Sequence, residues 1–190
     1  MRRVWFVVEP HPGLPVMAHT LVLFEFEQGE LIGLTVEARK QASEKYSALR
    51  GTLNAFELIY QWATPRDLLT RRAVYMDKAL YLYPLVLSQA ETEAYLRVLL
   101  EQTQRIEHHP RFYNTLTSNC TNELAKSAGL GWHPAFVLTG GADKALFDMG
   151  RIEGEGDFES IRAKARIDPR VIALAAHDES DFNAGLVSGR

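Results

Sequence analysis

The sequence predicts an α+β fold in which an antiparallel sheet packs against helices. Its N-terminal third is rich in branched and aromatic residues that alternate with polar ones, as half-buried strands do. Later segments repeat apolar residues at helical spacing, which indicates helices that cover the sheet. With 190 residues, 46% of them hydrophobic, the chain is long enough for one core. We expect a single domain over residues 1–168 and a partly flexible C-terminal extension over residues 169–190, polar and frayed from residue 177.

The predicted elements follow one another in a simple order along the chain. Strands are expected over residues 3–8, 18–26, 31–38, 53–62 and 79–85, with a polar loop over 39–51. Thr64 and Pro65 open a short helix, because proline suits the first helical position. Ser88 and Glu91 form a capping box at the start of a long helix that Pro110 ends. Further helices are expected over residues 119–128, 143–149 and 158–165.

The turn between the second and third strands sets their register. Residues 27–29 suit a three-residue hairpin loop closed by a glycine in the left-handed region. Phe26 then pairs with Glu30, and the same register places His19 opposite Glu37 on the odd-numbered face of the sheet. Facing residues of an antiparallel pair lie about 5 Å apart at Cβ. We therefore expect an imidazole–carboxylate hydrogen bond between His19 and Glu37.

The one cysteine, Cys120, lies where a polar loop over residues 113–118 becomes a helix capped by Ser118 or Asn119. A helix N-terminus presents unpaired N–H groups and a partial positive charge, which stabilise a thiolate. Cys120 is therefore a candidate nucleophile. The alternative is a small buried residue without chemistry, since free cysteine is often buried.

A cysteine nucleophile needs a base, and the base needs a partner that orients it. His19 lies in a strand opposite a carboxylate and is the best candidate, although a strand histidine is also a common structural residue. The other histidines lie beside prolines, at a helix end or in the C-terminal segment: His11, His108, His109, His133 and His177.

Composition excludes several classes of protein. A net charge of -3 gives no support for nucleic acid or an anionic membrane as a partner. One cysteine excludes an intrachain disulfide framework and a cysteine-based zinc site. The apolar run at residues 4–8 is interrupted before a signal peptide or a transmembrane segment is complete. This composition fits the cytosol and also leaves a bacterial envelope open. We expect no cofactor and no metal, because zinc on His19, Glu37 and Cys120 is a weaker interpretation than nucleophilic catalysis.

The order and setting of these residues resemble known enzymes. A helix-start cysteine beside a strand histidine resembles papain-like (NlpC/P60-type) enzymes, and the histidine-first order resembles their circularly permuted members. A wider set of blocks is similar to the DUF4105 family, or Lnb N-terminal periplasmic domain: Ala18-His19-Thr20, Val36-Glu37-Ala38-Arg39, Phe56-Glu57-Leu58-Ile59-Tyr60, Arg66-Asp67-Leu68, Tyr81-Leu82-Tyr83-Pro84-Leu85 and Phe112-Tyr113-Asn114-Thr115-Leu116-Thr117-Ser118-Asn119-Cys120-Thr121. The resemblance spans roughly residues 4–165 and implies a permuted papain-like fold in a bacterial envelope protein.

The resemblance also implies roles for individual residues. Cys120 would be the nucleophile, His19 the general base and Glu37 its orienting group. Arg39 would bind substrate or pair with Glu44 or Glu57. The remaining candidates would polarise a carbonyl or brace the loop: Tyr113, Asn114, Asn119 and Asn122.

The residues and the resemblance together predict a thiol-dependent acyltransferase or hydrolase that works through a cysteine thioester. The family's namesake moves acyl chains on lipoproteins, so lipoprotein or lipid acyl groups are the implied substrates. One alternative is a cysteine amidase or peptidase acting on cell-wall or other peptides. A greasy groove beside Cys120 favours acyl transfer, and a polar open cleft favours peptide cleavage. Another alternative is a non-catalytic binding domain with an inert, buried Cys120.

Overall fold

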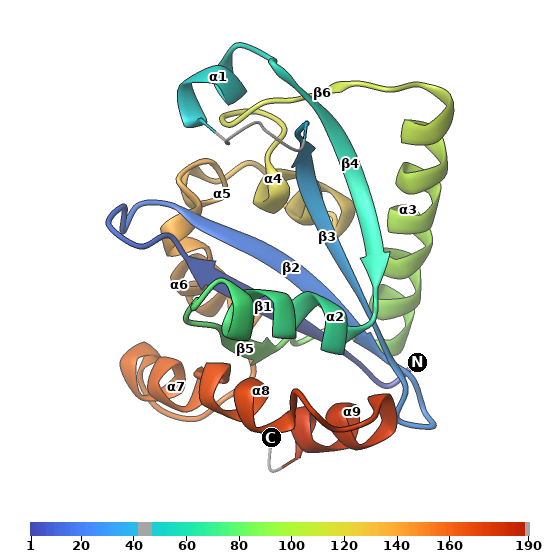
Figure 1. Cartoon of the computed structure of the whole chain (residues 1–190), viewed down its shortest axis with the longest axis vertical. Coiled ribbons are helices and arrows are strands. Elements are labelled where there is room, and N and C mark those ends of the chain that lie inside the picture. Colours follow the sequence, from blue (N-terminus) through green and yellow to red (C-terminus); the bar gives the residue numbers. More distant parts are fainter. Residues whose placement is uncertain (42–46, 189–190) are drawn as a thin grey trace.

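The structure is a computed structural model, and it describes residues 1–41 and 47–188. A six-stranded antiparallel sheet in the order β5-β1-β2-β3-β4-β6 forms its centre (Figure 1). The strands are β1 (Arg3–Pro10), β2 (Ala18–Glu25), β3 (Leu31–Arg39), β4 (Phe56–Ala63), β5 (Tyr81–Pro84) and β6 (Phe112–Tyr113).

The helices lie mainly in the second half of the chain. They are α1 (Ala48–Thr52), α2 (Pro65–Thr70), η1 (Arg71–Tyr75, a π-helical turn), α3 (Gln89–His108), α4 (Cys120–Ser127), α5 (Pro134–Val137), η2 (Thr139–Gly141, a 3-10 turn), α6 (Ala142–Asp148), α7 (Phe158–Ala165), α8 (Asp168–Leu174) and α9 (Glu179–Val187). The predicted α+β class is confirmed.

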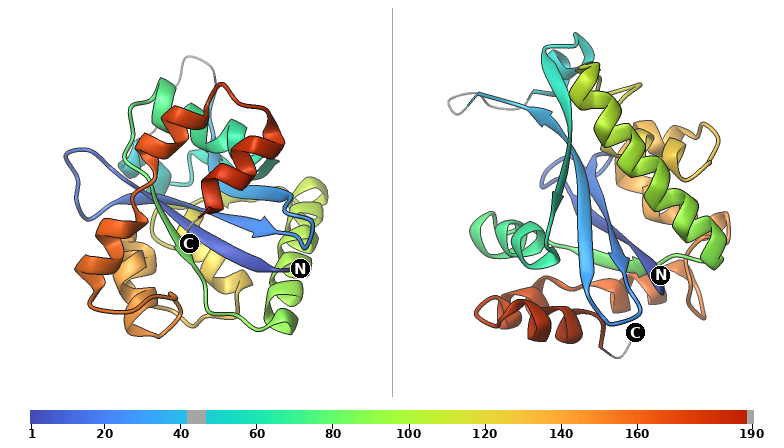
Figure 2. Two further views of the ribbon diagram at one scale, coloured as in Figure 1. Left: turned by 90° about the horizontal axis from the view of Figure 1, so that it is seen from below. Right: turned by 90° about the vertical axis from the view of Figure 1, so that its right-hand side faces the viewer.

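Each face of the sheet is covered by its own set of helices, as the right-hand view of Figure 2 shows. The even-numbered side chains of the central strands pack with α3, α4 and α6 in one core cluster. The odd-numbered side chains of β1 and β2 pack with α2, α8 and α9 in a second cluster. Burial of both faces explains why β1 and β2 are nearly continuous apolar runs.

The hairpin between β2 and β3 has the predicted register. The Phe26 N–H donates to the Glu30 carbonyl at 2.9 Å, and Gly29 has a φ of 92°. Leu21 pairs with Thr35, which is the register that the three-residue loop requires. The polar odd positions at the far end of this hairpin therefore lie on one face.

Two other local predictions are also confirmed. Ser88 caps α3 through a capping box with Glu91, and Thr64 caps α2 with proline at its first turn. The strand predicted from residue 53 begins only at Phe56, because Leu53 caps α1 and Asn54 turns the chain with a φ of 55°.

The structure has a helix in the C-terminal segment, where the sequence predicted a polar, frayed end from residue 177. Residues 179–187 form α9, and α8 begins at Asp168. Val171, Phe182 and Leu186 are fully buried against the odd face of the sheet. The sequence did not predict this packing, because α9 is mostly polar and its few apolar residues cover a sheet face that is distant in sequence.

Candidate active site

Helix α4 begins at Cys120, and its N-terminus is held by Asn119. The Asn119 Oδ1 accepts from the Asn122 N–H at 2.8 Å, which caps the helix. The Asn119 Nδ2 donates to the Thr115 carbonyl at 2.8 Å and to the Phe136 carbonyl at 3.1 Å. This buried amide thus joins the loop before α4 to α5 and fixes the position of Cys120.

The start of α4 lies against β2. The Thr20 and Thr121 hydroxyls are 2.9 Å apart in the buried interface, and the Thr20 N–H bonds to the Cys120 sulfur. Cys120 is 3% exposed and also shares a hydrogen bond with the side chain of His19. Two residues a hundred positions apart in the sequence are therefore in direct contact.

The other side of the His19 ring contacts a hydroxyl and a carboxylate. The His19 Nε2 lies 2.6 Å from the Thr35 Oγ1 and 3.1 Å from the Glu37 Oε1. The Thr35 hydroxyl donates to the same Glu37 oxygen at 3.0 Å. The predicted proximity of His19 and Glu37 is confirmed, and the Thr35 hydroxyl contacts both side chains.

A buried arginine from outside the hairpin holds Glu37. The Arg72 Nη2 donates to the Glu37 Oε1 at 2.8 Å, and its Nε lies 3.0 Å from the Glu9 Oε2. Arg72 Nη1 also donates to the Leu68 carbonyl at 3.0 Å. Arg72 belongs to the π-helical turn η1, a distortion that is frequent at functional sites.

The charges in this cluster shift the pKa values of its members. Burial alone lowers the pKa of His19, but the negative charges of Glu37 and Cys120 and their hydrogen bonds raise it to about 10. Burial raises the pKa of Glu37, but His19 and Arg72 outweigh this effect and lower it to about 2. Burial likewise opposes ionisation of Cys120, yet the charge and hydrogen bond of His19 keep the thiol pKa below its ordinary value. These shifts favour a thiolate beside an imidazolium.

Cys120, His19 and Glu37 line one cleft of about 640 Å³. Tyr113, Asn119 and Arg39 also line it. Its walls combine charged groups with apolar side chains, the latter being Met17, Ala38, Ile59, Met76 and Val137. The cleft is therefore neither the greasy groove nor the purely polar cleft that would distinguish acyl transfer from peptide cleavage.

Two predicted site residues lie outside the cleft lining. Asn114 Nδ2 donates to the Thr52 carbonyl at 3.1 Å, and its Oδ1 accepts from the Leu116 and Thr117 N–H groups. Asn122 Nδ2 donates to the Leu116 carbonyl at 2.9 Å. Both side chains brace the loop before Cys120.

Arg39 lies at the cleft rim and pairs with Glu57 at 3.1 Å. The other partner considered for it, Glu44, lies outside the described residues. No cluster of three or more metal-binding side chains occurs over residues 1–41 and 47–188.

Sequence reasoning missed Thr35 and Arg72. Thr35 could have been predicted from the sequence, because the hairpin register places it on the same face as His19 and Glu37. Arg72 could not have been predicted, since only the packing of η1 against the sheet brings it to the hairpin.

Comparison with known proteins gives the family. The chain matches the Lnb N-terminal periplasmic domain over residues 1–140, which include every residue of the site described above. The chain belongs to this family. No match was found among curated proteins or among solved structures.

Membership of a periplasmic domain family indicates a location in the cell envelope. In the part of the chain that the structure describes, no helix combines the length and hydrophobicity that crossing a bilayer requires.

Proposed function

We propose that this protein is a thiol-dependent acyltransferase or hydrolase that forms an acyl thioester on Cys120. The observation that carries the proposal is the contact chain from Cys120 through His19 to Glu37, in a cleft open to a substrate. This is the order of nucleophile, base and orienting group that covalent acyl transfer uses.

The His19 ring divides its two nitrogens between these tasks. Its Nε2 contacts Thr35 and Glu37, so the Nδ1 is the nitrogen assigned to Cys120. Glu37 holds the proton on Nε2 and stabilises the positive charge of the ring. Nδ1 then exchanges a proton with the thiol and with the leaving group.

The reaction proceeds in two balanced steps. The Cys120 thiolate attacks the carbonyl carbon of an ester or amide, and the backbone N–H groups at the start of α4 stabilise the oxyanion. His19 gives its Nδ1 proton to the departing alcohol or amine as the carbon–oxygen or carbon–nitrogen bond breaks. Water or an amine then attacks the thioester, His19 takes its proton, and the thiolate leaves.

We further propose that the fold is a permuted papain-like fold. The helix-start cysteine contacts a strand histidine that precedes it in the chain, which is the arrangement and order of that group. Acyl groups of lipoproteins or lipids are the proposed substrates, in keeping with the family's namesake.

The test measures alkylation of Cys120 by iodoacetamide as a function of pH. Rapid labelling near pH 6 in the parent, slowed or shifted to higher pH in His19→Ala, is the expected result. His11→Ala is the matched control, because His11 lines the same cleft and its Nδ1 lies 2.8 Å from the Pro12 carbonyl oxygen. An ordinary thiol pKa in all three proteins would overturn the proposal and favour a binding domain.

The acyl-enzyme itself is detectable by mass spectrometry. A p-nitrophenyl butyrate ester and a peptide p-nitroanilide are offered separately to the parent and to Cys120→Ser. We expect a butyryl mass increase on Cys120 in the parent only. Release of nitroaniline without any ester turnover would instead favour a peptidase.

A further inference from the structure

The cleft around Cys120 has a charge opposite to that of the whole chain. Its lining contains two carboxylates, Glu9 and Glu37, whereas the chain carries a net charge of -3. Against these two acids stand five cationic side chains, Arg39, Lys40, Arg71, Arg72 and Lys78. This surplus of positive charge surrounds the candidate nucleophile.

Ion pairs within the described part of the chain do not account for three of these cations. Arg72 engages both cleft carboxylates, and Arg39 pairs with Glu57. Lys40, Arg71 and Lys78 have no acidic partner among residues 1–41 and 47–188. Lys40 directly follows β3, Arg71 is the first residue of η1, and Lys78 lies shortly after η1.

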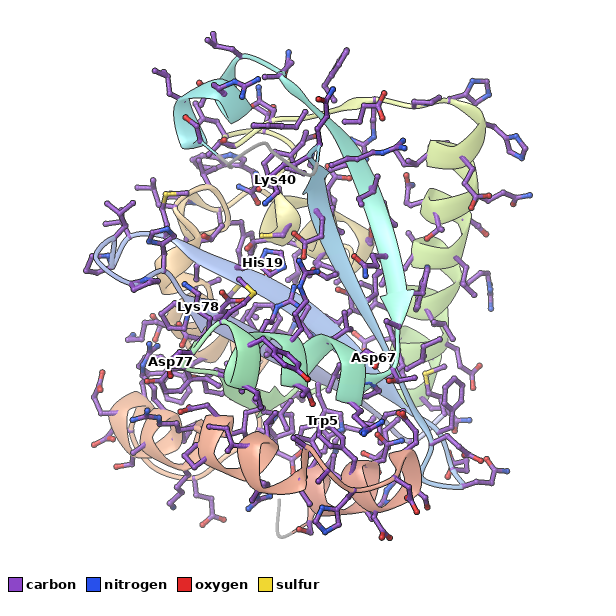
Figure 3. The ribbon with its side chains drawn as sticks, viewed as in Figure 1. Trp5, His19, Lys40, Asp67, Asp77 and Lys78 are labelled. Carbon is purple, nitrogen blue, oxygen red and sulfur yellow. The ribbon has the colours of Figure 1, made fainter. Side chains whose placement is uncertain are left out.

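These cations surround the reacting groups. In Figure 3 Lys40 lies above His19, and Lys78 lies below it and to its left. Both lysines and Arg71 line the same cleft as His19 and Cys120. A concave site with a surplus of one sign of charge concentrates ligands of the opposite sign.

We propose that the cleft selects substrates that carry a phosphate or carboxylate near the reacting carbonyl, and that Lys40, Arg71 and Lys78 bind this anionic group. The apolar wall, which includes Ile59 and Met76, then accommodates the uncharged part of the same molecule. The inference rests on the proposed thioester function, because it concerns the substrate of that reaction.

The first experiment compares an anionic with a neutral alkylating reagent on the single cysteine. The ratio of the iodoacetate rate to the iodoacetamide rate at Cys120 is divided by the same ratio for N-acetylcysteine. At low ionic strength we expect a preference for iodoacetate of at least about threefold, and a decline in 0.5 M salt. The imidazolium of His19 also attracts iodoacetate, so the decisive comparison is between variants.

The charge variant is Lys40→Gln/Arg71→Gln/Lys78→Gln, and we expect it to lose most of the preference. Its matched control removes three cations outside the cleft, Arg97→Gln/Arg105→Gln/Arg151→Gln, and should keep the preference. Equal ratios in the parent and the charge variant would overturn the inference. An ordinary thiol pKa with iodoacetamide would instead count against the thioester function, so the two failures are distinguishable.

The second experiment separates the possible sources of the anion. This experiment measures how far a ligand protects Cys120 against iodoacetamide. The ligands are octyl phosphate, octyl glucoside and inorganic phosphate, and the two octyl compounds are used below their critical micelle concentrations. Protection by octyl phosphate alone would support a lipid-like phosphate, and protection by inorganic phosphate as well would support a soluble anion. Equal protection by octyl phosphate and the neutral octyl glucoside would overturn the anion selectivity.

Discussion

Replacing Glu37 with glutamine tests whether its charge holds the proton on His19. The Glu37 Oε1 lies 3.1 Å from the His19 Nε2, and the pKa of His19 is raised to about 10. The variant removes the charge while the glutamine oxygen still accepts a hydrogen bond. We expect the imidazole of His19 to lose its proton at a lower pH.

The size of the shift follows from the geometry. Two unit charges about 4 Å apart interact by about 4 kcal/mol at an effective dielectric constant of about 20, equivalent to about 3 pKa units. The side chains of His19 and Glu37 are 22% and 32% exposed, so solvent screens part of this energy. The remaining hydrogen bond and the Cys120 thiolate also continue to favour the imidazolium. A fall of about 1 to 2 units in the pKa of His19 is therefore expected for Glu37→Gln.

The assay is NMR titration of histidine ring resonances in isotopically labelled protein. The His19 signal is assigned by its absence from His19→Gln. Glu57→Gln serves as the control, because Glu57 pairs with Arg39 and lies outside the cleft lining. A His19 midpoint within about 0.3 unit of the parent value in Glu37→Gln would refute the reasoning.

Three further predictions concern stability. Arg72→Met leaves the carboxylates of Glu9 and Glu37 without their shared cation. It should lower the free energy of unfolding, measured by urea denaturation at pH 7, by about 3–5 kcal/mol, and an unchanged value would mean that these ion pairs do not stabilise the fold. Phe182→Ala removes a fully buried ring from the cluster beneath α9 and should cost about 3–5 kcal/mol, whereas an unchanged melting temperature would mean that the C-terminal helix is not part of the core. The stabilising contribution of Glu37 is lost as pH falls from 4.5 to about 2, and that of His19 is lost as pH rises from 6.5 to about 10. The free-energy difference between the parent and His19→Gln/Glu37→Gln should therefore be largest between pH 4.5 and 6.5, and a difference independent of pH would contradict this.

Local signals in the sequence were sufficient for the elements that local interactions form. The capping box of Ser88 and Glu91 marks the start of α3, and the glycine at position 29 sets the hairpin loop. The hairpin register then places His19 and Glu37 on one face without reference to the rest of the molecule. Each of these signals acts over a few residues or across one tight turn, so it can be read from the chain itself.

Only the tertiary structure decided which distant side chains meet. Arg72 reaches Glu37 because η1 packs over the odd face of the sheet, and no spacing in the sequence encodes that contact. The same packing recruits α9, whose polar composition predicted a frayed end. The sequence by itself therefore determined the fold class, the hairpin and the candidate residues Cys120, His19 and Glu37. Only the tertiary structure shows that the buried Arg72 contacts Glu37, that cations line the cleft, and that a second core forms on the other face of the sheet. The reason is that burial of apolar surface brings segments together regardless of their separation along the chain.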